Sequence, residues 1–152
     1  MKNNFILTFL LSVLFSSSVL ASEISISEQY VRETIPGTTI SSAYMLIKNT
    51  GDKDVALKSI TSPVSARIEL HEHLMADGMM QMQQVESIIV KANDKTVLQP
   101  HGYHVMIFNL DEPLMAGSSI DMALKFDNGK TVNIKVPVQG LKKKTHSHSH
   151  NH

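Results

Sequence analysis

The sequence predicts an all-β protein of short antiparallel strands, and three observations support this fold class. Apolar and β-branched residues recur in short runs, many with the alternation of a half-buried strand. Turn-forming residues separate the runs, and no stretch shows the longer apolar period of an amphipathic helix. Strands of this length and spacing are typical of a sandwich or barrel.

Taken in chain order, the runs account for most of the sequence between residues 24 and 138. They cover residues 24–31, 40–49, 55–60, 66–73, 80–85, 87–90, 95–98, 103–110, 119–126 and 131–138. Asp77-Gly78 is a turn signal that predicts a change of chain direction between two of the runs. The clearest hairpin is the last, because Asp127-Asn128-Gly129 lies between two alternating runs and Asn-Gly favours a type I′ turn.

Two histidines and two methionines are the candidate ligands of a metal site. They are His71, Met82, His104 and Met106. Thioether sulfurs are neutral and polarizable, so they bind hard Mg²⁺ or Ca²⁺ poorly and favour Zn²⁺ little. Two imidazoles with two thioethers suit Cu(I) better than other common biological metals. An isolated Met is more often a core residue and an isolated His more often a surface residue, so the assignment depends on the four occurring together.

Strand geometry favours convergence of these ligands. His104 and Met106 stand two residues apart in one apolar run, and alternate residues of a strand face the same way. His71 and Met82 lie on either side of the Asp77-Gly78 turn, so a hairpin brings that half of the set together.

The segments that carry these residues are 69–73, 77–82 and 102–106, and they resemble the PCuAC family of periplasmic copper chaperones. The family signature is His, ten residues, Met, twenty-one residues, His, one residue and Met, and positions 71, 82, 104 and 106 reproduce it without a gap. Further matching segments are 43–49 with Gly51, 62–63, 98–100 and 136–138. The resemblance therefore extends over about residues 26–138.

This resemblance implies a cupredoxin-like Greek-key β-sandwich or barrel with copper at one end. It also implies a function, because the family carries Cu(I) in the periplasm. The acceptor it implies is the dinuclear copper centre of cytochrome c oxidase subunit II, supplied alongside a Sco-type thiol chaperone. Neutral thioethers hold Cu(I) less firmly than thiolates, which suits a carrier. The alternative function is a periplasmic copper buffer that sequesters excess metal for copper tolerance.

Other histidines and methionines near the four candidates leave alternatives open. His73 is two residues from His71 on the same strand face and competes as nitrogen donor, although the family spacing favours His71. The methionines that precede Met82 are either a soft route for copper or a flexible apolar cover, and we favour the cover. They are Met75, Met79 and Met80. His101 lies in a Pro-His-Gly turn and is not among the predicted ligands.

Three segments are expected along the 152-residue chain. Residues 1–21 have the basic start, the apolar stretch and the small-residue end of a secretory signal, which predicts export and cleavage after Ala21. That the exported product is periplasmic is what the family resemblance implies. The apolar stretch is too short for a membrane anchor, so we expect a product that is free of the membrane. We also expect it to be a monomer. Residues 22–140 form the copper-binding β domain, and residues 141–152 a basic, His-rich disordered tail.

The tail is a separate feature with its own chemistry. Its alternating histidines are His146, His148, His150 and His152. Imidazole-rich segments suit Cu(II), so we expect an auxiliary Cu(II) site there, the alternatives being a solvated tail of weak affinity and an expression tag.

Composition excludes several other functions. The chain contains no cysteine, which rules out a lipid-attachment cysteine, a disulfide framework, thiolate catalysis and a blue-copper electron carrier. Lys plus Arg and Asp plus Glu both number 14, so there is no electrostatic signature of nucleic-acid binding. We also expect no enzymatic activity, because the chain has no nucleophile elbow and no helical pair of zinc-site histidines.

Overall fold

The computed structural model describes residues 23–141, and this part of the chain is all-β. Its strands are β1 (Ile24–Arg32), β2 (Ser41–Asn49), β3 (Val55–Thr61), β4 (Arg67–Ala76), β5 (Met79–Gln84), β6 (Ile88–Val90), β7 (Asp94–Leu98), β8 (His104–Phe108), β9 (Ser119–Phe126) and β10 (Thr131–Gln139). Over these described residues, no helix is long and apolar enough to cross a membrane. The expected signal segment and the four tail histidines lie outside the described residues.

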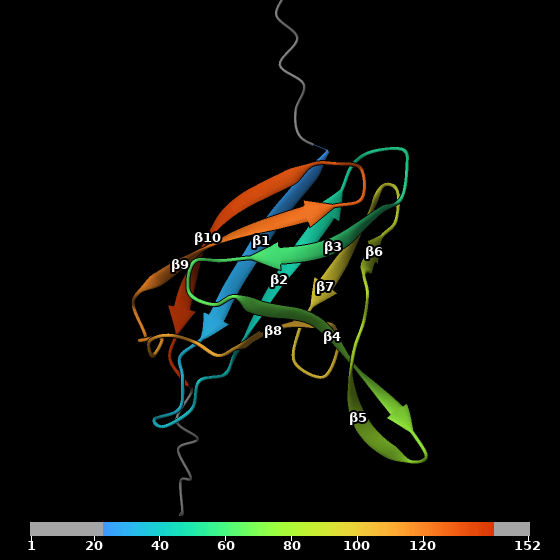
Figure 1. Cartoon of the computed structure of the whole chain (residues 1–152). Helices are drawn as coiled ribbons and strands as arrows, with labels where there is room; N and C mark the ends of the chain where they lie inside the picture. Colours follow the sequence, from blue (N-terminus) through green and yellow to red (C-terminus); the bar gives the residue numbers. More distant parts are fainter. Residues whose placement is uncertain (1–22, 142–152) are drawn as a thin grey trace, which may run out of the picture.

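The strands pair in a continuous path that folds into two packed layers. The order is β5-β4-β8-β2-β1-β10-β9-β3-β6, and β7 pairs with β2. One layer contains β1, β2, β4, β5, β7 and β8, and the other contains β3, β6, β9 and β10. Figure 1 shows β3 and β9 crossing in front of β1 and β2. The protein is therefore a β-sandwich in which β5 and β6 are the ends of the path.

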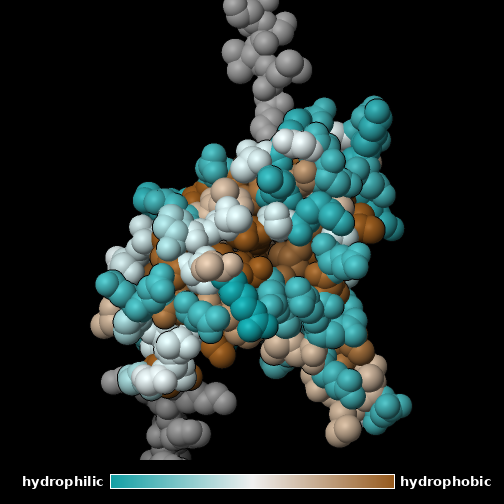
Figure 2. All heavy atoms as spheres, viewed as in Figure 1, coloured by the Kyte–Doolittle hydropathy of each residue, from teal (hydrophilic) through white to brown (hydrophobic). Residues whose placement is uncertain are grey.

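Strand β5 extends one edge of the sandwich into solvent. Strand β8 pairs with β4 only from Arg67 to His71, whereas β5 pairs with β4 from His71 to Ala76. We call residues 72–84 the arm, because β4 has no sheet neighbour other than β5 there. The arm projects from the body at the lower right of Figures 1 and 2. All six residues of β5 are exposed.

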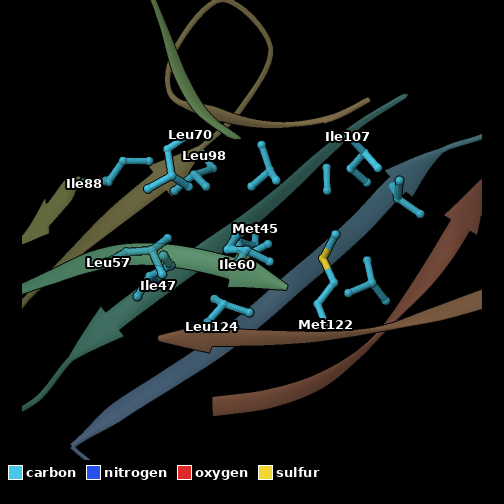
Figure 3. Packing of buried hydrophobic residues seen from close by; sticks show 14 of the residues in the cluster. Met45, Ile47, Leu57, Ile60, Leu70, Ile88, Leu98, Ile107, Met122 and Leu124 are labelled. Carbon is cyan, nitrogen blue, oxygen red and sulfur yellow. The ribbon is translucent and has the colours of Figure 1, made fainter. Parts of the chain in front are cut away.

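The core lies between the two layers and is made of aliphatic side chains. Alternation places Met45 and Ile47 of β2 on the inner face, where they meet Leu57 of β3 and Leu124 of β9 (Figure 3). Each of these side chains is at most 2% exposed. Burial of apolar area at about 25 cal/mol per Å² is the main stabilising contribution to such a layer pair.

The ten predicted runs correspond to the ten strands, with boundaries that differ by at most three residues. One pairing departs from the antiparallel prediction. Val31 and Arg32 of β1 pair in parallel with Val138 and Gln139 of β10. This short parallel contact joins the two layers, and it depends on the position of strands from opposite ends of the chain. Strand periodicity contains no information on that pairing.

The structure agrees with the prediction at one of the two hairpin turns and differs from it at the other. Asp77 (φ 52°) and Gly78 (φ 73°) both have positive φ, as the two central residues of a type I′ turn require. The type I′ prediction for the last hairpin is wrong. Of its three loop residues only Gly129 has a positive φ (82°), which is typical of a type I turn followed by a left-handed residue. Asp127 exchanges hydrogen bonds with Ala56 of β3, which explains the longer loop.

Neighbouring isoleucines on β6 provide a test of the core. Ile88 is 0% exposed and Ile89 is 58% exposed. Ile88→Ala is expected to lower the free energy of unfolding by about 2–5 kcal/mol, because it leaves a cavity between the layers. Ile89→Ala is expected to change it by less than about 0.5 kcal/mol. Urea denaturation measures both, and equal losses would contradict the assignment of the inner face.

Candidate metal centre

The predicted ligands lie on the face of the first layer that points away from the core. Ala43 of β2 pairs with Val105 of β8, and both are fully buried in the core. The adjacent positions therefore face outwards, and here Ser42 pairs with Met106. On β4, Leu70 faces the core, so Glu69, His71 and His73 face outwards together. We call this outward surface of β4, β5 and β8 the donor face.

His71 and His104 form a directly opposed pair across β4 and β8. Their ring centroids are 5.8 Å apart. His73 stacks on His104 with a centroid separation of 4.9 Å. The structure therefore gathers three imidazoles at one place on the donor face, two of which are predicted ligands.

Hydrogen bonding orients His104 with one nitrogen available. Its Nδ1 lies 2.9 Å from the carbonyl oxygen of Gly102, and a carbonyl only accepts, so Nδ1–H is the donor. Its Nε2 is buried and has no hydrogen-bond partner among the described residues. Burial lowers the pKa of His104, the Gly102 bond opposes this, and His73 and His71 lower the pKa further. The result is a neutral imidazole whose Nε2 lone pair is free for a metal.

A carboxylate orients His71 in the same way. Its Nε2 lies 2.8 Å from Oε2 of Glu69, and its Nδ1 is buried without a partner among the described residues. Arg67 donates from Nε to the other oxygen of Glu69 at 2.7 Å. The hydrogen bonds from His71 and then Arg67 lower the pKa of Glu69, so it stays a carboxylate. Such a carboxylate–histidine pair fixes the tautomer of a metal-ligating imidazole.

The strand register places the two predicted methionine ligands on either side of His71. Met106 pairs with Glu69, two residues before His71 on β4. Met82 pairs with His73, two residues after His71. Diagonal neighbours on one sheet face lie about 7–8 Å apart at Cα, within reach of long side chains. His71 is therefore opposite His104 and diagonal to both methionines. Met82 and Met106 stand two strands apart, roughly 10 Å in a flat sheet, and four residues apart along the strands.

His73 and His101 lie beside this set. His73 has a buried Nδ1 without a partner among the described residues, and its ring is 5.8 Å from that of exposed His101. His73 is opposite Met82 but two residues farther from the level of Met106 than His71 is. The register thus gives His71 the central position, and it leaves His73 adjacent.

Sequence reasoning missed the groups that orient the imidazoles. Glu69 and Gly102 were included in the matching segments without a role. The signal for Glu69 was present, because a carboxylate two residues before a histidine in a strand shares its face. The signal for Gly102 was absent, because its carbonyl depends on the loop before β8.

Imidazoles and carboxylates alone do not form a metal site here. Within residues 23–141, no group of three His, Cys, Asp or Glu side chains is arranged to hold a metal ion. The further donors that the register places on this face are the thioethers of Met82 and Met106, which suit soft metals. A surface groove of about 610 Å³ beside Pro63, Met122 and Lys135 belongs to the other layer and contains no histidine.

Known proteins resemble this chain both in sequence and in structure. Residues 24–138 match the family described as "Putative lipoprotein LpqE-like". The chain is 31% identical to "Putative lipoprotein Lxx21020" of Leifsonia xyli subsp. xyli over 120 residues, which cover 78% of this chain and 71% of that protein.

Two solved structures illustrate the structural likeness. The copper-bound PCuAC domain from PmoF2 has a TM-score of 0.68 at 21% identity, covering 79% of this chain and 95% of that domain. The Cu(I) form of DR1885 from Deinococcus radiodurans has a TM-score of 0.61 at 27% identity, covering 75% of this chain and 78% of that protein. The predicted cupredoxin-like Greek-key sandwich is thereby confirmed.

Glu69 provides a test of the oriented imidazole. Glu69→Gln removes the charge that holds the His71 tautomer, so Cu(I) affinity is expected to fall by about 10–100-fold in a competition titration. Glu72→Gln is the matched control, because Glu72 points to the opposite face and bonds to Gln83. Equal affinities in the two variants would contradict the role of Glu69.

Proposed function

The chain belongs to the LpqE-like family, which is the PCuAC family, and from this premise we propose that it is a copper carrier whose donor face binds Cu(I). The proposed ligands are His71, Met82, His104 and Met106. Binding and transfer of the ion are the whole activity, without a catalytic step.

The observation that carries the proposal is the central position of His71. It is opposite one proposed ligand and diagonal to the other two, so it neighbours each of the other three proposed donors on the face. Both imidazoles of the proposed site have a nitrogen available for a metal. Nδ1 of His71 and Nε2 of His104 are buried and lack hydrogen-bond partners among the described residues. Buried polar atoms without partners are costly, and a bound metal would relieve that cost.

The donor chemistry favours the reduced ion. Neutral imidazoles and thioethers bring no negative charge, and soft thioether sulfurs prefer Cu(I) to divalent metals. The likeness to DR1885, a protein solved in its Cu(I) form, supports the same oxidation state. The absence of cysteine leaves the hold on copper weaker than that of a thiolate site.

We propose that this moderate hold serves delivery in the periplasm after export. The proposed acceptor is the dinuclear copper centre of cytochrome c oxidase subunit II, with a Sco-type thiol chaperone as partner. Thiolates bind Cu(I) more tightly than thioethers do, so transfer to a cysteine-containing acceptor is downhill. Association with nucleic acid has no role in this proposal, because the formal net charge is zero.

A sulfur deletion tests the site. Met106→Leu keeps an apolar side chain of similar volume, so the fold is expected to persist while the tight Cu(I) equivalent is lost in a competition titration under reducing conditions. Met115→Leu is the control, because Met115 is 66% exposed in a loop outside the donor face. Retention of tight binding by Met106→Leu would remove Met106 from the ligand set.

A deletion strain separates delivery from the alternative of copper buffering. Delivery predicts defective oxidase assembly at low copper, restored by the wild-type chain but not by Met106→Leu. Buffering predicts normal oxidase assembly at low copper and poor growth at high copper. Oxidase activity and growth curves measured on the same strain distinguish the two functions.

A further inference from the structure

The arm carries sulfur donors that the proposed copper site does not use. On β4 and β5, Met75 pairs with Met80, and this pair is two residues along the strands from the pair of His73 with Met82. Paired residues share a face, and alternate residues along a strand share it as well. Met75 and Met80 therefore lie on the donor face, in line with His73. Met79 pairs with Ala76 and lies on the opposite face of the arm.

Met75 and Met80 are not packed over the histidines in this structure. Met75 is 65% exposed and Met80 is 53% exposed, and the arm projects beyond the body of the protein (Figure 2). A cover over the histidines would bury its side chains against them. In this structure the two thioethers are therefore accessible to a metal in solution, as the alternative interpretation of a soft route for copper requires.

His73 provides a nitrogen donor at the base of the same row. Its Nδ1 is buried and has no partner among the described residues. It is two residues from Met75 on β4 and diagonal to Met80 on β5. It also stacks on His104, so it connects the row of thioethers to the inner pair of imidazoles.

We propose that His73, Met75 and Met80 form a second, outer Cu(I) site on the arm, which receives copper before it reaches the inner site. The inference rests on the proposed function of the inner site. One imidazole and two thioethers are neutral, soft donors, and they bind Cu(I) more weakly than the four inner donors because there are fewer of them. Copper moves inward by ligand exchange, without a change of oxidation state.

Met82 is the intermediate position in this exchange. It is opposite His73 and diagonal to His71, so it borders both donor sets. The ion can thus gain an inner ligand before it loses an outer one. Along β4 and its neighbours the donors form a continuous series from the exposed end of the arm to partly buried His71 and buried His104. The series is Met75/Met80, then His73/Met82, then His71/His104.

The test is an anaerobic Cu(I) titration of the full chain followed through the methyl signals of its methionines. All proteins carry Asn in place of the four tail histidines, so that the tail adds no equivalents. The first equivalent is expected to shift the methyl signals of Met82 and Met106. A second, weaker equivalent is expected to shift those of Met75 and Met80 and to leave that of Met79 unchanged.

A matched pair of variants completes the experiment. Met75→Leu/Met80→Leu is expected to lose the second equivalent and keep the first, and Met79→Leu is expected to keep both. Methyl signals of Met75 and Met80 that stay unchanged through two equivalents would overturn the outer site. If the protein with all its methionines showed no first equivalent at Met82 and Met106, the inner site would be overturned instead. The two failures are therefore distinguishable.

Discussion

The antiparallel pairing of β4 with β8 is the contact on which the donor face depends. This pairing sets His71 opposite His104 and Glu69 opposite Met106. Because side chains alternate between faces with a period of two, a slip of one residue would turn His71 into the core and Leu70 into solvent. The buried residues Leu70, Val105 and Ile107 prevent that slip. The core thus specifies the register, and the register specifies which donors meet.

Polar contacts then give each imidazole its orientation. The Gly102 carbonyl and the Glu69 carboxylate each lie within hydrogen-bond distance of one ring nitrogen, and the other nitrogen of each ring is buried without a partner among the described residues. His104 is 2% exposed although it is on the outward face, because the rings of His71, His73 and Tyr44 surround it. Burial and orientation act together, since burial also favours the neutral form.

The body and the arm differ in the number of neighbouring strands that stabilise them. His71 lies where β4 has strand neighbours on both sides, whereas in the arm β5 is the only strand paired with β4. A two-stranded ribbon without a covered face is the less stable part of such a fold. Met82, Met75 and Met80 are all on this ribbon. Sulfur donors on the less constrained element are suited to exchange, and nitrogen donors on the rigid element are suited to retention.

The sequence by itself determined the strands and the four candidate donors, because alternation and turn residues act locally and because the spacing of soft ligands is written along the chain. The strand positions and the Asp77-Gly78 turn agree with that local information. The tertiary structure alone decided which strands are neighbours beyond the two predicted hairpins, including the parallel contact of β1 with β10, and it decided the three-residue loop at Gly129. It also decided that His71 is central, that Glu69 and Gly102 orient the imidazoles, and that Met79 is separated from Met75 and Met80. Those outcomes depend on pairing between residues far apart in the chain, and periodicity within one strand does not specify its partner.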